Sequence, residues 1–166
     1  VVPLDLGAFV GRLFFGVLRA GRNCQQYQKD EGRNAEVSDE ARDWFIAEYV
    51  PLWASMDSVD PAEVKKHWVE DFRDHPVDIE SRTVENSVKQ WQRTIERYRN
   101  SGVQDSTLLK VKAERINDWT VLLRARWKDE PPISPDDPDF CDAYLVGKFG
   151  EGWKITNAFT TDCEGH

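Results

Sequence analysis

A change of hydrophobic period near Gly102 constrains the fold of this chain more than any other feature. Before Gly102, apolar residues recur every three or four positions, as they do from Val84 to Tyr98. After Gly102 they alternate with polar residues, as they do from Leu109 to Ala113. The first period is typical of helices and the second of strands. The sequence therefore predicts a helical half followed by an antiparallel sheet.

Helix signals divide the first half into three predicted helices. Ser38 has the side chain of an N-cap and is followed by acidic residues, and Pro51 is expected to bend this first helix. Asp60 and Pro61 are typical of a cap and a first helical residue, so they begin the second helix. The third helix is expected to end at Gly102.

Residues 1–36 are expected to form an N-terminal arm, and residues 37–166 the domain proper. The stretch LDLGAFVGRLFFGVL, residues 4–18, has apolar positions at helical spacing, but it contains Arg12 and is too short to span a bilayer. It also lacks the basic leader of a signal peptide. We expect an amphipathic helix that docks on protein; docking on a membrane face and a processed chain end are the alternatives.

Two hairpins are predicted after Gly102. A three-residue turn at 117–119 pairs Ala113 with Leu123 and gathers the apolar side chains on one face, whereas a shorter turn would put Glu114 on that face. A second turn at 150–152 pairs Leu145 with Asn157. Between the hairpins, residues 129–139 (DEPPISPDDPD) are expected to form a loop.

Charge and cysteine content exclude some classes of function. The net charge of −8, without clustered Lys and Arg, argues against nucleic-acid binding. The chain has three cysteines, Cys24, Cys141 and Cys163, an odd number without zinc spacing. We therefore expect reduced cysteines, a cytoplasmic protein and no metal or other cofactor, although Cys141 and Cys163 could pair.

The order of elements, the opening EARDWFIAEYVPLWASMD and the terminal strand with GWKI resemble the nuclear-transport-factor-2-like superfamily, in particular its SnoaL-like branch. The resemblance extends from Val37 to Thr161. It implies an α+β cone, in which a strongly curved mixed sheet is covered by three helices and a pocket opens between them. Members of this superfamily include cyclases, isomerases, dehydratases and binding domains, so the fold does not select an activity.

The predicted register defines the concave face of this cone. It would carry Leu109, Val111, Ala113, Val121, Leu123, Ala125, Trp127, Ala143, Leu145, Ile155, Asn157 and Phe159. Glu114 and Asp142 alternate to the outer face, so the carboxylate sets of the superfamily's enzymes are not transferred to this chain. Leu122, Tyr144 and Val146 would also face outward, which predicts a homodimer through the outer sheet face.

His75 is the candidate acid/base residue. If Val77 and Ile79 point into the pocket, alternation also turns His75 inward, and Asp74 or Asp71 could orient its ring. The competing interpretation is that these polar residues and Pro76 only end the second helix at an exposed edge.

The candidate ligand-binding residues are mostly aromatic: Tyr49, Trp53, Trp91, Tyr98, Leu123, Trp127, Asn157 and Phe159. The amide of Asn157 needs partners, and a ligand, an ordered water or a helix end would each provide them. The sequence thus favours binding of a small hydrophobic molecule. The alternatives are a cofactor-free dehydratase, isomerase or cyclase that uses His75, and a protein-association module.

Overall fold

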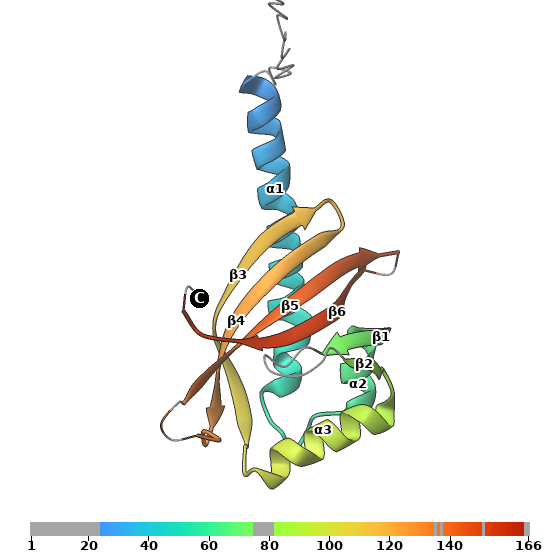
Figure 1. Ribbon diagram of the computed structural model, residues 1–166, viewed down its shortest axis with the longest axis vertical. Helices are drawn as coiled ribbons and strands as arrows, with labels where there is room; N and C mark the ends of the chain where they lie inside the picture. The colour runs from blue at the N-terminus through green and yellow to red at the C-terminus, as the bar shows by residue number, and fades with distance from the viewer. Residues whose placement is uncertain (1–23, 75–81, 135, 137, 151, 165–166) are drawn as a thin grey trace, which may run out of the picture.

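The computed structural model describes residues 24–74, 82–134, 136, 138–150 and 152–164, without the side chains of 24–31, 73–74 and 82–83 (Figure 1). The elements in chain order are α1 (Cys24–Trp44), a π-helical turn η1 (Phe45–Tyr49), a 3₁₀ turn η2 (Val50–Trp53), α2 (Pro61–Lys66), β1 (Trp68–Asp74), β2 (Arg82–Glu85), α3 (Val88–Asn100), β3 (Asp105–Asn117), β4 (Thr120–Glu130), β5 (Asp139–Phe149) and β6 (Gly152–Thr161). The six strands form one curved, open mixed sheet in the order β2-β1-β6-β5-β4-β3. This confirms the predicted α+β cone.

The core lies between the first helical segment and the concave face of the sheet. The Phe45 ring packs 5.0 Å from the ring of Tyr144 and 6.1 Å from that of Trp127, measured between ring centroids. Buried aromatic side chains supply large apolar area with few rotors. They therefore hold the helices against the strands.

The first helix is longer than predicted. It begins at Cys24 rather than at Ser38, so the prediction of Ser38 as N-cap is wrong. Its N-terminal part extends beyond the sheet (Figure 1). The α-helix ends at Trp44, before Pro51, and Pro51 lies in the 3₁₀ turn η2; the predicted bend at Pro51 stays a prediction. Proline has no backbone N–H to continue the α-helical bonds.

The start of α2 agrees with the sequence analysis, but its end does not. Asp60 caps the helix, and its carboxylate accepts a hydrogen bond of 2.8 Å from the backbone N–H of Ala62. The stretch after His67, expected to end this helix, instead forms β1, which pairs antiparallel with β2 and parallel with β6. Trp68 and Phe72 of β1 are buried, which stabilises the strand.

The third helix is also shorter than its apolar period suggests. Val84 belongs to strand β2, and α3 begins after Ser87, whose hydroxyl accepts a hydrogen bond from the backbone N–H of Gln90. The predicted stop at Gly102 is confirmed, since this residue has a φ of 85°. Glycine adopts this left-handed conformation without the steric cost of a Cβ.

The register of the first hairpin is partly as predicted. Ala113 pairs with Leu123, but the turn has two residues and the register shifts by one near Ile116. A second shift, at Leu109, places Leu108 opposite Trp127. Leu109 is consequently 48% exposed, and its predicted place on the concave face is wrong. One extra residue in a strand reverses the faces of all residues beyond it.

The second hairpin has the predicted pairs but the opposite faces. Leu145 pairs with Asn157 and Ala143 with Phe159, as expected, whereas Gly147 pairs with Lys154 instead of Ile155. Tyr144 lies opposite the buried Leu123 of β4, so Tyr144 and Val146 face the core. The predicted inward positions of Ala143, Leu145, Asn157 and Phe159 are wrong, and so is the outward position of Tyr144 and Val146. The convex side of β5 instead carries Ala143, Leu145 and Gly147.

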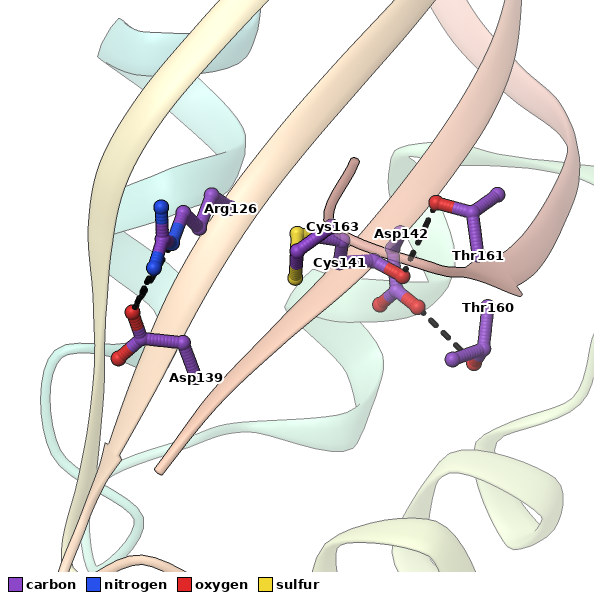
Figure 2. Close-up of a disulfide and its surroundings, with 7 residues drawn as sticks. All are labelled: Arg126, Asp139, Cys141, Asp142, Thr160, Thr161 and Cys163. Carbon is purple, nitrogen blue, oxygen red and sulfur yellow. Dashed lines mark hydrogen bonds and ion pairs between the residues drawn. A yellow bond between two sulfur atoms is a disulfide. The ribbon is translucent and has the colours of Figure 1, made fainter. Parts of the chain in front are cut away.

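Cys141 and Cys163 form a disulfide, with a Cα–Cα distance of 5.3 Å (Figure 2). The prediction of reduced cysteines is therefore wrong. The bond joins β5 to the segment after β6. Cys141 is opposite Thr161 in the sheet, two residues before Cys163, which brings the two Cα atoms within disulfide distance.

Candidate functional site

A cavity of about 840 Å³ lies between α3, the small strands β1 and β2, and the inner face of β4, β5 and β6. This volume is in the range of small-molecule sites. Its aromatic lining comprises Tyr49, Trp53, Trp68, Phe72, Trp91, Tyr98, Trp127, Phe140, Tyr144 and Phe159. Such a lining can bury a flat or otherwise apolar molecule.

Three rings form one wall of the cavity. Phe72 stacks on Trp91 with 5.5 Å between ring centroids, and Trp68 lies 4.4 Å from Phe72 and 5.1 Å from Trp91. The buried Asn86 holds this wall: its carbonyl oxygen accepts from Nε1 of Trp91 at 2.7 Å, and its amide nitrogen donates to the backbone oxygen of Trp68 at 3.0 Å. Asn86 therefore fixes the position of the wall relative to α3.

Asp142 supplies a carboxylate to the opposite side of the cavity. Its Oδ2 accepts a 3.2 Å hydrogen bond from the hydroxyl of Tyr144. Its Oδ1 accepts one of 3.0 Å from the hydroxyl of Thr160, which Figure 2 shows. Tyr144, Thr160 and Asp142 all line the cavity. The predicted placement of Asp142 on the outer face is thus wrong, since alternation from Tyr144 turns both side chains inward. A carboxylate is tolerated there because hydroxyl groups bind it.

Two tyrosine hydroxyls of the cavity are held in the neutral form. Burial raises the pKa of Tyr144 well above its usual range, and the nearby charge of Asp142 adds to the rise. Burial also raises the pKa of Tyr49, although the indole groups of Trp68 and Trp53 oppose the increase. Neutral phenols donate one hydrogen bond each: Tyr144 donates to Asp142, and the Tyr49 hydroxyl can stabilise an acceptor.

Asp129 supplies a second carboxylate, on the face of β4 that also carries Trp127. Asp129 is buried and accepts a 2.5 Å hydrogen bond from the hydroxyl of Ser106, which lines the cavity. Burial raises the pKa of Asp129, and the hydrogen bond from Ser106 acts in the opposite direction. The sequence analysis assigned Asp129 to a loop, but β4 continues to Glu130.

Two residues of the lining carry buried indole donors. In the part of the chain that the structure describes, the indole nitrogens of Trp68 and Trp127 have no hydrogen-bond partner. A buried polar group without a partner calls for a ligand or a water to bind it. At the mouth of the cavity, Arg93 and Arg97 of α3 are exposed, and Arg93 donates to the side chain of Gln90 at 3.1 Å.

The structure brings together five of the eight predicted ligand-binding residues. Tyr49, Trp53, Trp91, Tyr98 and Trp127 line the cavity, whereas Phe159 borders it but pairs with Ala143, so its side chain alternates to the convex side. Leu123 is fully buried in the core behind it. Asn157, opposite Leu145, points to the convex side. Residues that the sequence analysis missed include Trp68, Phe72, Asp142, Tyr144 and Thr160; correct strand parity would have identified the last three.

The predicted catalytic group is not assembled by the described residues. His75 and the side chain of Asp74 lie outside them, and Asp71 is exposed. His67, the other internal histidine, packs between the rings of Trp44 and Tyr49 at 5.9 and 6.0 Å. Burial lowers the pKa of His67, so the imidazole is neutral at physiological pH. His67 does not line the cavity.

The described residues contain neither a cluster suited to a metal ion nor a helix suited to span a membrane. No three His, Cys, Asp or Glu side chains among these residues converge on a point where they could bind a metal ion. None of the helices described is both long and apolar enough to cross a bilayer.

The fold is shared with solved structures of low sequence identity. An NTF2-like protein with a cystatin-like fold from Novosphingobium aromaticivorans is 14% identical, with a TM-score of 0.55 over 88% of this chain and 94% of that one. A domain of unknown function from Nostoc punctiforme is 17% identical, with a TM-score of 0.51 over 75% and 76% of the two chains. A protein from N. aromaticivorans described as a putative aromatic ring hydroxylase is 14% identical, with a TM-score of 0.51 over 77% and 90%.

A family model gives a more direct relationship than these structures. No curated protein matches the chain in sequence. Residues 39–163 match the model of the NTF2-like protein family DUF6841. This range runs from the end of α1 through the last strand to the disulfide. The chain therefore belongs to the NTF2-like protein family DUF6841.

Proposed function

We propose that this protein binds a small, largely aromatic molecule in the cavity and that Asp142 binds a hydroxyl or amino group of that molecule. The observation that carries the proposal is a carboxylate, oriented by Tyr144 and Thr160, in a cavity with aromatic walls. Apolar walls with a few placed polar groups are typical of small-molecule sites.

The chemistry of the cavity limits the class of ligand. A carboxylate accepts up to about four hydrogen bonds and donates none while ionised. The ligand group near Asp142 should therefore be a donor.

Three naphthalene probes that differ in one polar group test this proposal. Isothermal titration should show binding of 2-naphthylmethylamine and 2-naphthylmethanol and weaker binding of 2-naphthoate, which repels a carboxylate. Asp142→Asn should weaken binding of the amine about tenfold or more, because a charged hydrogen bond contributes about 1.5–3 kcal/mol. The exposed Asp57, outside the cavity, provides the matched control, and Asp57→Asn should not change the affinity.

Two results would contradict the proposal. One is that none of the three probes binds to folded wild-type protein at millimolar concentration. The other is that Asp142→Asn and Asp57→Asn bind the amine equally well.

Proton transfer is a second candidate, favoured by the contact between Asp142 and a phenol inside the cavity. An ionised carboxylate can remove a proton next to a carbonyl group, and the neutral hydroxyl of Tyr49 can stabilise the oxyanion that forms. His75 stays a candidate for the same role. Incorporation of deuterium from D₂O into 2-acetylnaphthalene, followed by NMR, would measure this activity. Its loss in Asp142→Asn or in His75→Gln would identify the base.

Some expectations from the sequence stay proposals. A homodimer would form through the convex face of the sheet, where Leu122 and Leu145 pair and are partly exposed. Analytical sedimentation would measure the oligomeric state. Association with another protein through the N-terminal arm, and membership of the SnoaL-like branch, also stay predictions. A cytoplasmic location agrees poorly with the disulfide, since such bonds persist mainly in oxidising compartments.

A further inference from the structure

The disulfide and the cavity carboxylate occupy adjacent positions of β5. Cys141 points to the convex side and bonds to Cys163, while Asp142 points into the cavity (Figure 2). Asp142 lies opposite Thr160 in the sheet, and Cys141 lies opposite Thr161. One end of β6 therefore carries both the disulfide-linked segment and the hydroxyl that binds Asp142.

Pairing with β5 and the disulfide hold this end of β6 in the described part of the sheet. Among the described residues, β1 pairs with β6 only as far as Ala158. Beyond that point, Thr160 and Thr161 are paired with β5, and the hydroxyl of Thr161 contacts the backbone oxygen of Cys141 at 3.5 Å. The ends of strands open more readily than their centres unless another bond holds them. The disulfide is such a bond.

The disulfide is also accessible from the outside. Cys141 is fully buried, whereas Cys163 is partly exposed. A second hollow, of about 470 Å³, lies beside the bond on the convex side, with Arg126, Asp139 and Asp162 in its lining. An external thiol can approach Cys163 through this hollow.

We propose that the Cys141–Cys163 disulfide is a redox-controlled clamp that keeps Thr160 against Asp142 and so maintains the affinity of the cavity. Ligand control of this kind rests on the function proposed above. An external thiolate attacks Sγ of Cys163, the S–S bond breaks, and Cys141 leaves as a thiolate that takes up a proton. A second external thiol then displaces Cys163 from the mixed disulfide. Two external thiols are oxidised to one disulfide, and the protein disulfide is reduced to two thiols.

Hydrogen exchange measured by mass spectrometry tests the clamp without any ligand. The experiment uses the full chain with Cys24→Ser, which prevents exchange of disulfide partners, before and after reduction by dithiothreitol. Reduction should accelerate exchange of the amides of residues 158–164 about tenfold or more and leave those of β3 unchanged. Equal exchange in the two states would overturn the clamp, and acceleration in β3 as well would show general unfolding instead.

Affinity for 2-naphthylmethylamine then tests the control of the cavity. Reduction should weaken binding about tenfold, and so should Cys141→Ala with Cys163→Ala. Thr160→Val, which keeps the disulfide, should reproduce the loss of affinity without the change in exchange. Equal affinity of the oxidised and reduced forms would overturn redox control. If the probe binds neither form, the proposed function fails, and hydrogen exchange alone decides whether the clamp exists.

Discussion

Asn86→Ala should be among the most destabilising single substitutions on the polar framework of this fold. The Asn86 side chain is 2% exposed and makes three hydrogen bonds: to Nε1 of Trp91 at 2.7 Å, and to the backbone oxygens of Lys65 and Trp68 at 3.0 Å each. These bonds join α2, β1 and α3. The substitution leaves one buried donor and two carbonyl groups without this partner.

The expected loss follows from these three contacts. An orphaned buried donor costs about 1–3 kcal/mol, and each carbonyl, which has a second lone pair, costs less. The void left by the amide adds about 1 kcal/mol. We expect the free energy of unfolding to fall by about 3–5 kcal/mol, a large part of the total of about 5–15 kcal/mol for a domain. Urea denaturation of the oxidised protein, followed by tryptophan fluorescence, measures this change.

Two further variants test whether the lost hydrogen bonds of Asn86 cause the destabilisation. Asn100, at the exposed end of α3, is the control, and Asn100→Ala should change stability by no more than about 0.5 kcal/mol. Asn86→Asp preserves the shape but points an oxygen at two carbonyl oxygens, so it should be as damaging as Asn86→Ala. If Asn86→Asp were as stable as wild type, or if Asn86→Ala matched Asn100→Ala, the hydrogen-bond argument would be wrong.

Two other predictions concern the sheet. Burial raises the pKa of Asp129, so the folded state binds the proton of this carboxyl more tightly than the unfolded state does. The protonated carboxyl therefore stabilises the fold fully below its ordinary pKa of 3.8, and this stabilisation is lost as pH rises through the pKa of the folded state. The stability of Asp129→Asn relative to wild type should therefore increase between about pH 4 and pH 7 in urea titrations, and a constant difference would contradict this. The register shift in β3 predicts that Leu108→Ala lowers the free energy of unfolding by about 2 kcal/mol and Leu109→Ala by less than about 0.5 kcal/mol. The reverse order in the same assay would indicate that β3 alternates without a register shift.

Hydrophobic period was sufficient to predict the helical half, the sheet and the pairing of Ala113 with Leu123. It could not predict the extra residue at Leu109, because a bulge leaves no mark in a pattern that is apolar at both Leu108 and Leu109. It also could not orient β5. Both faces of that strand carry apolar side chains, so the apolar face chosen from the pairing of Ala143 and Leu145 was the wrong one, and Asp142 was placed outward as a consequence.

The conformation around His67 shows a second limit of local signals. Asp60 and Pro61 correctly indicated the start of α2, since capping depends only on neighbouring residues. The end of α2 depends on distant partners: the backbone oxygen of His67 accepts from the N–H of Ile155 at 2.8 Å, and β1 then pairs with β6. A short apolar and acidic stretch such as WVEDFRD becomes a strand because the sheet edge is available, not because of its own propensity.

The two carboxylates misplaced by the sequence-based prediction share one arrangement. Asp142 lies directly opposite Thr160, and Asp129 lies directly opposite Ser106; in each pair the hydroxyl donates to the carboxylate across the strands. Directly opposed side chains are close enough for this bond, which offsets part of the cost of placing a carboxylate on an inner face. The rule that charged residues point outward therefore fails where a hydroxyl stands opposite the charge. The strand register determines which hydroxyl lies opposite each carboxylate, whereas composition does not. The polar pairs of this cavity can therefore be predicted only once the strands have been paired.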